Sequence, residues 1–553
     1  MKGHLLLNIT LVALTVLLTP GCQSAKTGDE IMNIYKDTIK IGWAKRSIIP
    51  NEPVPITGQF HLRVSQGVYS PVLASALVLE KNSEAAIFVS VDVVFVRPLV
   101  LQIAQDFLKK EAPEIPADNL IINATHTHAG PGNCDVEDDD YPHGVKFMSG
   151  NKVAEFIARQ IADAVKEAWQ KRAPGSIAYG YGFATTGHSR RVIYLDDISK
   201  RIAPRPGITV DGHGKMYGQT NDEMFDCYEA GTDSFINLLY TFDEKGKLSG
   251  AIVNVPCPSQ TNEGAWALHA SFWDNVRRKL AEKYGEIGLV CQSAAAGDLS
   301  PRQLHYLEAE LRRYRLKYAD KIEEYFNNPM AYPPSWVPNP EIARKQYESD
   351  VVDVIRAEEI ASRIVAAFDE VLEWAQKEKF SNPVLKHEVK AVKLARLMFP
   401  KELAEEESRN YQMFMQKEFQ TEGEEFDMLF NNSRLVRQRT RCGGVEKRYK
   451  IQQEQPFIDA EIHVVRIGNI AFASNQFELF MDYMHRIQGR SPFEQTFIVQ
   501  LTAGPEDIAS YLATERAVAN RGYSASPYCN LVSPEGGQQL VNETLKILEE
   551  IKK

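Results

Sequence analysis

The chain has 553 residues, of which 44% are hydrophobic and 25% are charged. This composition is sufficient for one large or two ordinary hydrophobic cores, and it excludes a mostly disordered chain. Lys and Arg number 63 against 73 Asp and Glu, which gives a formal net charge of -10, and no basic stripe is visible. The sequence therefore predicts a globular protein that does not bind nucleic acid.

The N-terminus has the pattern of an export signal. Lys2 supplies positive charge, and the apolar run over residues 5–18 is too short for a comfortable membrane span. The following segment, which ends at Cys22, resembles a bacterial lipobox with its leucine one place further upstream than usual. We expect a lipoprotein-type signal peptide over residues 1–22, a lipid anchor on Cys22 and a polar tether over residues 23–38. Ordinary secretion and an uncleaved anchor are the alternatives.

From residue 39 onward, strand-like and helix-like segments alternate. The pattern predicts, in chain order, strands over 72–79 and 86–96, a helix over 99–110, a strand over 120–124, a long amphipathic helix over 151–171, strands over 176–182, 235–242 and 250–255, a helix over 272–284 and a strand over 288–292. Such alternation indicates a layered α/β catalytic domain with mixed sheets, whose site lies at the carboxyl ends of strands.

Apolar side chains recur at helical spacing over residues 304–326, and residues 351–372 form a second helical segment. Together they predict a helical hairpin inserted over about residues 302–380. Its aromatic stripe is more typical of packing than of a ligand site, although the hairpin could form one wall of a substrate entrance. After a charged stretch, strand character resumes over residues 460–473.

Two alternating histidines, His126 and His128, directly follow the predicted strand over 120–124 and precede a Gly/Pro-rich segment. Histidine is the commonest protein ligand for zinc, and a strand end holds imidazoles rigidly while leaving them open to a substrate. An extended backbone would place both rings on one side. The alternative is that one of them is only a hydrogen-bonded loop residue.

A second unusual segment, Gly297-Asp298-Leu299-Ser300-Pro301, follows the predicted strand over 288–292. Its small residues allow close backbone approach and suit an active-site turn. The alternative is a capping turn, in which Asp298 or Ser300 closes a helix that begins after the proline.

The segment from Thr125 to Gly132 resembles the THTHSGPGG signature of the neutral/alkaline ceramidases, with Ala129 in place of serine. Further stretches resemble the same family in the same order, from about residue 39 to about residue 526. The family consists of zinc-dependent amide hydrolases. The resemblance implies a ceramidase-like catalytic domain over residues 39–553. Only about thirty residues follow Tyr523, so we expect no C-terminal immunoglobulin-like domain.

The resemblance also implies a set of zinc ligands. His126 corresponds to the first histidine, Glu478 to the glutamate and Tyr511 to the tyrosine. The family's second histidine is replaced by Cys257. A thiolate is a strong zinc ligand, so Cys257 could complete the site; the alternatives are a buried Cys257 beside a three-ligand site, or loss of metal binding. His269 is a further possible ligand, although a hydrogen-bonded core role is more typical.

Catalytic roles follow from the same resemblance. Ser300 corresponds to the family's proposed nucleophile, and Asp298 could orient it. His128 and Tyr523 are candidate hydrogen-bond donors to the substrate carbonyl. Arg190 corresponds to an arginine at the polar end of the pocket; the alternatives are that Arg191 is the equivalent residue, or that Arg190 is an ordinary surface arginine.

The sequence thus predicts a zinc-dependent hydrolase that cleaves the amide bond of an N-acylated lipid such as ceramide, held at a membrane in the periplasm or on the cell surface. One alternative is a hydrolase of another amide or ester. A second is a non-catalytic surface lipoprotein that binds a lipid or glycan. The true substrate, the oligomeric state and the cysteine pairing do not follow from the sequence.

Overall fold

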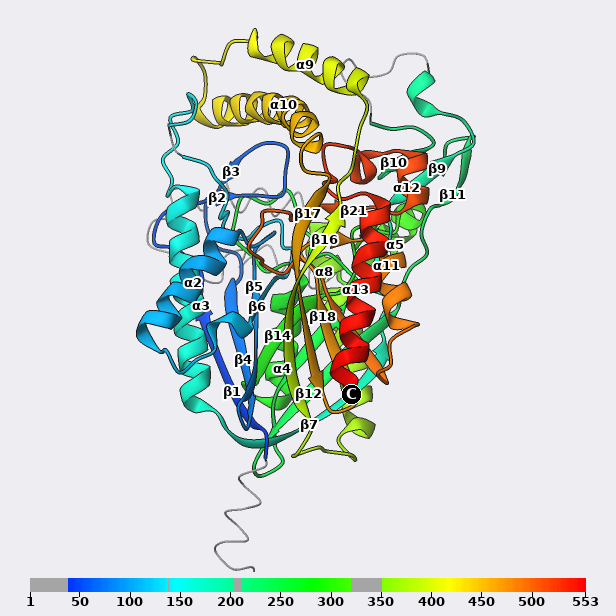
Figure 1. Ribbon diagram of the computed structural model, residues 1–553. Coiled ribbons are helices and arrows are strands. Elements are labelled where there is room, and N and C mark those ends of the chain that lie inside the picture. Colours follow the sequence, from blue (N-terminus) through cyan, green and yellow to red (C-terminus); the bar gives the residue numbers. More distant parts are fainter. Residues whose placement is uncertain (1–37, 138, 202–209, 320–350) are drawn as a thin grey trace, which may run out of the picture. The chain divides into compact units, whose positions relative to one another are not determined.

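An eight-stranded mixed sheet forms the larger half of the fold (Figure 1). Its strands, in spatial order, are β14 (Gly288–Ser293), β13 (Leu248–Val255), β12 (Phe235–Asp243), β7 (Ala173–Phe183), β1 (Lys40–Ser47), β4 (Leu73–Lys81), β5 (Glu84–Val91) and β6 (Leu120–Ala124). The pairs β13/β14 and β5/β6 are parallel, and the other pairs are antiparallel.

The structure is a computed structural model that describes residues 38–137, 139–201, 210–319 and 351–553. The predicted signal peptide, nearly all of the predicted tether and residues 320–350 of the predicted hairpin lie outside these ranges. Within them, no helix combines the length and the apolar character needed to cross a bilayer.

A second sheet of four strands packs on the first. In spatial order it contains β16 (Leu385–Ala395), β17 (Phe457–Ile467), β18 (Ile470–Ser474) and β20 (Gln495–Val499). Side chains alternate between its two faces, so that Val465 joins the core shared with the larger sheet while Val464 faces the opposite core. The strand character predicted over residues 460–473 belongs to two antiparallel strands, because the chain turns at Gly468, where φ is +62°.

Helices cover the outer faces of both sheets, which gives the layer order helix, sheet, sheet, helix (Figure 1). The larger sheet is covered by α2 (Pro98–Glu111), α3 (Gly150–Lys171), α4 (Phe272–Tyr284) and α8 (Val351–Ala375). The smaller sheet is covered by α11 (Met481–Gln488) and α13 (Pro534–Lys552). The predicted layered α/β class is confirmed.

Two long helices were not predicted, α9 (Lys401–Met415) and α10 (Glu425–Gln452). They pack against each other in the highly charged stretch before β17. Only a few of their side chains are buried, such as Leu429, which joins a small apolar cluster with Leu62 and Phe147. Their apolar stripe is too sparse to stand out from the charges that surround it.

The remaining described elements are short. They are β2 (Pro55–Ile56), β3 (Arg63–Val64), β8 (His188–Ser189), β9 (Arg191–Tyr194), β10 (Gly214–Met216), β11 (Phe225–Tyr228), β15 (Leu299–Ser300), β19 (Glu478–Leu479), β21 (Tyr511–Leu512), α5 (Leu307–Lys317), α12 (Glu515–Asn520), and the 3-10 turns η1 (Ala117–Asn119), η2 (Ile198–Lys200), η3 (Leu304–Tyr306) and η4 (Tyr523–Ala525).

The carboxyl ends of strands from both sheets meet in one region. At the end of β6, the backbone N–H of Ala124 donates to the carbonyl of Leu501, which follows β20. Ser293 ends β14, and its carbonyl accepts from the backbone N–H of Gln500. The Asn123 amide also donates to the Cys291 carbonyl at 2.9 Å, which links β6 to β14. Loops that leave these strands are therefore brought together, and they carry the candidate site.

Candidate active site

Side chains from loops far apart in the sequence converge beyond the ends of β6 and β13. His126 follows β6, Arg190 lies between β8 and β9, and Gln260 follows β13. Glu478 and Tyr511 begin the short strands β19 and β21, which pair in parallel with these two residues in register. The pairing explains why two residues of the predicted ligand set lie side by side although 32 residues separate them in the sequence.

The backbone and ring of His126 are both fixed. Its φ is +64°, in the left-handed region that non-glycine residues adopt only where the surroundings enforce it. Its Nδ1 lies 2.8 Å from the Val94 carbonyl oxygen, which can only accept a hydrogen bond, so Nδ1 carries the proton. In the neutral imidazole the lone pair is then on Nε2, which points into the site, the arrangement that is typical of metal-binding histidines.

A carboxylate faces that lone pair. Oε2 of Glu478 lies 3.4 Å from Nε2 of His126 and 3.7 Å from Nη2 of Arg190. Burial acts to raise the pKa of Glu478, but His126, Arg190 and a hydrogen bond from Tyr511 outweigh it and hold the pKa below its ordinary value. The group is therefore ionised at neutral pH.

Arg190 is almost completely buried and connects the site residues. Its Nη2 donates to the hydroxyl of Tyr511 at 3.1 Å and to the carbonyl of Gly297 at 2.8 Å. The choice between the two neighbouring arginines is thereby clear, because Arg191 makes a separate buried ion pair with Glu229. Burial raises the pKa of Tyr511 well above its ordinary value, which keeps the phenol protonated while no metal is bound.

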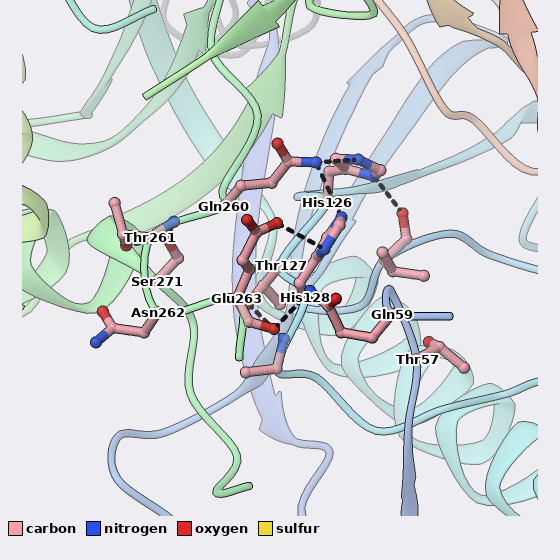
Figure 2. Close-up of polar contacts among 12 residues, drawn as sticks. Thr57, Gln59, His126, Thr127, His128, Gln260, Thr261, Asn262, Glu263 and Ser271 are labelled. Atoms are coloured by element: carbon pink, nitrogen blue, oxygen red, sulfur yellow. Dashed lines mark hydrogen bonds and ion pairs between the residues drawn. The ribbon is translucent and has the colours of Figure 1, made fainter. Parts of the chain in front are cut away.

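Gln260 is a site residue that sequence reasoning missed. Its Oε1 accepts from Nη1 of Arg190 at 3.1 Å. Its Nε2 donates to Nε2 of His126 at 3.2 Å and to Nε2 of His128 at 2.9 Å (Figure 2). The hydroxyl of Tyr217 adds a weaker contact to Oε1 at 3.4 Å. The residue lies in the same loop as Cys257, and a neutral amide gave no signal of its own.

Glu263 is the second missed residue. Its Oε2 lies 3.4 Å from Nδ1 of His128, opposite the ring nitrogen that faces Gln260 (Figure 2). Burial raises the pKa of Glu263, and burial together with the nearby positive charges lowers the pKa of His128 well below its ordinary value. His128 is thus a neutral imidazole between an amide and a carboxyl group.

Cys257 is not brought into this group. Its side chain is fully buried, and the thiol donates to the Thr186 carbonyl at 3.1 Å. Burial raises the pKa of the thiol, which favours the neutral form over the thiolate that binds metal. In the described part of the chain, Cys257 therefore corresponds to the alternative of a buried cysteine beside a three-ligand site. His269 is likewise a core residue: its Nδ1 accepts from the Ser271 backbone, and burial lowers its pKa to about 4.

The Gly297–Ser300 turn borders the site. A Cβ atom at Gly297 would lie 2.3 Å from the carbonyl oxygen of Glu478, so only glycine permits this approach. Oδ1 of Asp298 accepts from the backbone N–H of Met481 at 3.1 Å, at the start of α11. Ser300 is fully buried, and its Oγ accepts from the Arg302 backbone at 3.1 Å. The structure gives neither side chain a contact with His126 or Glu478 among the described residues.

The ring of Tyr523 packs between the rings of Tyr511 and Phe60. The distances between ring centroids are 6.1 Å to Tyr511 and 5.2 Å to Phe60. Phe60 is exposed, so the three rings form a path from the surface to the site. Burial raises the pKa of Tyr523, which remains a protonated donor.

A cavity of about 370 Å³ adjoins the site and is partly formed by the predicted hairpin. Its lining combines aliphatic and charged side chains: Tyr217, Arg302, Leu304, Leu307, Glu310, Leu311, Val352, Asp353 and Arg356. Tyr217 contacts Gln260, and Nη2 of Arg302 lies 3.8 Å from Oε1 of Glu263, so the cavity reaches the site through two residues. Its volume lies within the usual range for small-molecule sites.

The side chains fit a divalent metal bound by three residues. Nε2 of His126 and the carboxylate of Glu478 face each other at 3.4 Å, so a cation bound between them would neutralise the carboxylate in place of a proton on the imidazole. Tyr511 would supply a third oxygen. Within the described ranges, no group of three or more His, Cys, Asp or Glu side chains is spaced to hold a metal ion. The set of His126, Glu478 and Tyr511 differs from such a group because its third member is a tyrosine.

Comparison with solved structures identifies the fold. A ceramidase complexed with C2 superimposes with a TM-score of 0.58 at 17% sequence identity, over 93% of this chain and 75% of that chain. The neutral ceramidase from Pseudomonas aeruginosa gives a TM-score of 0.57 at 18% identity over the same shares. No protein-family model and no curated protein sequence matches the chain. The chain therefore has the fold of the neutral ceramidases, and the resemblance seen in the sequence is confirmed at the level of the fold.

Proposed function

We propose that the chain is a zinc-dependent hydrolase that cleaves the amide bond of an N-acylated lipid such as ceramide. The observation that carries this proposal is the convergence of His126, Glu478 and Tyr511 around one point beside the buried guanidinium of Arg190. The ceramidase fold supports the same reaction class. His126, Glu478 and Tyr511 would hold the zinc ion.

A bound zinc ion would acidify a water molecule and polarise the substrate carbonyl. The chain's own residues account for the other requirements of amide cleavage. Arg190 places a buried positive charge beside the metal ligands, where negative charge develops on the carbonyl oxygen. His128, kept neutral by burial, can accept a proton at Nε2 and pass it to the leaving nitrogen. Glu263 faces Nδ1 of the same ring and would stabilise the imidazolium that forms.

Ser300 remains a predicted nucleophile. Direct attack requires Oγ to reach the substrate carbonyl, whereas Oγ is engaged with the Arg302 backbone in a fully buried turn. Ser300 lies in the same turn as Gly297, whose carbonyl accepts a hydrogen bond from Arg190. This contact supports a role for the turn in holding the site together.

The nature of the cavity favours a second candidate. The paired charges of Arg302, Arg356, Glu310 and Asp353 line it together with leucines. A purely aliphatic chain gains nothing from such pairs, so a substrate with a polar or charged group beside its acyl chain, another amide or an ester, is the runner-up. In both cases we propose an exported enzyme held at a membrane through Cys22.

The proposal is tested by metal content and hydrolysis together. Purified full chain is expected to retain about one zinc ion per molecule, and His126→Ala and Glu478→Ala are expected to lose both the metal and chelator-sensitive hydrolysis of N-acyl amides. His305→Ala, which changes an exposed histidine outside the site, is the matched control. A folded, metal-free wild-type protein that hydrolyses none of a panel of N-acyl lipids and esters would contradict the proposal and favour a non-catalytic binding protein.

A further inference from the structure

The orientation of the Gln260 amide is determined by its neighbours. A guanidinium has only donors, so the group that Arg190 Nη1 contacts at 3.1 Å must be the amide oxygen. The amide nitrogen then points to Nε2 of His126 and Nε2 of His128, at 3.2 Å and 2.9 Å. Its two hydrogens match one lone pair on each neutral imidazole, and Figure 2 shows the contacts from the amide to the two rings.

The hydrogen bond from Gln260 to His126 uses the Nε2 lone pair that a metal ion would need. A neutral imidazole nitrogen has one lone pair, and Nδ1 of His126 already carries the proton that binds the Val94 carbonyl. Nε2 can therefore accept a hydrogen from Gln260 or bind a metal ion, but it cannot do both. Turning the amide by half a rotation is opposed, because the NH₂ group would then face the donors of Arg190.

We propose that Gln260 competes with the metal ion for His126, so that the metal binds only when the amide withdraws and its affinity is limited by the hydrogen bonds that hold the amide in place. The inference rests on the proposed function, because it assumes a metal at His126, Glu478 and Tyr511. It assigns Gln260 the role of a positioning residue that sets metal affinity through His126.

The test measures zinc affinity directly, by competition with a chromophoric chelator on the full chain prepared metal-free. Gln260→Met keeps the length of the side chain but has no N–H, and Gln260→Leu is a second donor-free variant. Both are expected to bind zinc about tenfold more tightly than the wild type, as the release of about one hydrogen bond allows. Gln260→Glu, which still accepts from Arg190 but donates nothing to His126, is expected to bind at least as tightly.

Gln59→Met is the matched control. Gln59 lies in the same region and its amide donates to the Glu263 backbone carbonyl, but it does not contact His126 (Figure 2). Its zinc affinity should equal that of the wild type, and thermal unfolding of each metal-free variant shows whether it is folded.

The outcomes separate the two proposals. Zinc affinity in folded Gln260→Met or Gln260→Leu that is equal to or weaker than in the wild type overturns competition while the zinc site stands. A gain confined to Gln260→Glu also overturns it, because an added carboxylate ligand would then be the cause. Absence of zinc binding in the wild type and in every variant overturns the proposed function and this inference with it.

Discussion

At the scale of single residues, the two histidines differ in what faces their second nitrogen. Nδ1 of His126 faces a backbone carbonyl, whereas Nδ1 of His128 faces the carboxyl group of Glu263. A carbonyl only orients a ring, but a carboxylate also stabilises a positive charge on it. This difference suits His126 to metal binding and His128 to proton transfer.

Glu263 can therefore be tested apart from the metal. Glu263→Gln is expected to lower kcat by about 10- to 100-fold with little change in KM, because the imidazolium of His128 loses its charged partner. Zinc content should not change, and Glu263→Asp should recover part of the rate. Steady-state kinetics together with metal analysis would check this. A loss of zinc, or a rise in KM alone, would assign Glu263 a structural role instead.

The sequence predicted His126, Glu478, Tyr511 and Arg190 because each has a side chain whose chemistry stands out within a recognisable motif. The structure places all four together. Gln260 and Glu263 escaped prediction for a different reason. An amide and a carboxyl group in a loop are ordinary, and only the path of the loop after β13 shows what they face. The same path turns Cys257 toward Thr186, which its position in the motif could not reveal.

At the scale of elements, the Gly297–Ser300 turn joins the site to α11. Burial raises the pKa of Asp298 from 3.8 to about 6, although its carboxyl accepts the Met481 N–H at the start of the helix. Because the folded pKa is the higher one, the stabilising effect of the protonated form is present below about pH 4 and is lost as the pH rises to about 6.

Asp298→Asn should consequently stabilise the protein at pH 8 by at most about 3 kcal/mol, with little effect at pH 4, since the amide keeps an acceptor for Met481 without a buried charge. Urea unfolding at the two pH values measures the difference, with the exposed Asp226→Asn as control. An equal change at both pH values would contradict the assignment. If the stabilised variant also loses hydrolysis, Asp298 takes part in the chemistry.

Prediction of elements succeeded where the hydrophobic period was clear. In α3 the buried positions Val153, Ile157, Ile161 and Val165 recur every four residues, and the predicted and observed bounds agree within one residue. The helices α9 and α10 lack such a stripe. The hairpin of β17 and β18 reads as one apolar run, because the strands are joined by a turn of two residues, Gly468 and Asn469.

At the scale of the whole molecule, the order of layers was predictable from alternating elements, but the stacking of two sheets was not, because it depends on strands more than 300 residues apart such as β5 and β18.

The proposed lipid anchor on Cys22 is also tested at the scale of the whole molecule. Cys22→Ser should move the protein from the membrane fraction to the soluble exported fraction, as cell fractionation would show, while hydrolysis of a water-soluble N-acyl amide stays unchanged. An unchanged distribution would contradict lipidation.

The pairing of Glu478 with Tyr511 in a ladder of two residues affects when the protein can acquire its ion. A nascent chain that has emerged as far as residue 470 already carries both histidines and Arg190, yet it lacks Glu478 and Tyr511, the two proposed oxygen ligands. On the proposed function, loading must wait until synthesis and any translocation are almost finished. The ion supply of the compartment in which folding is completed would then decide which metal the enzyme carries.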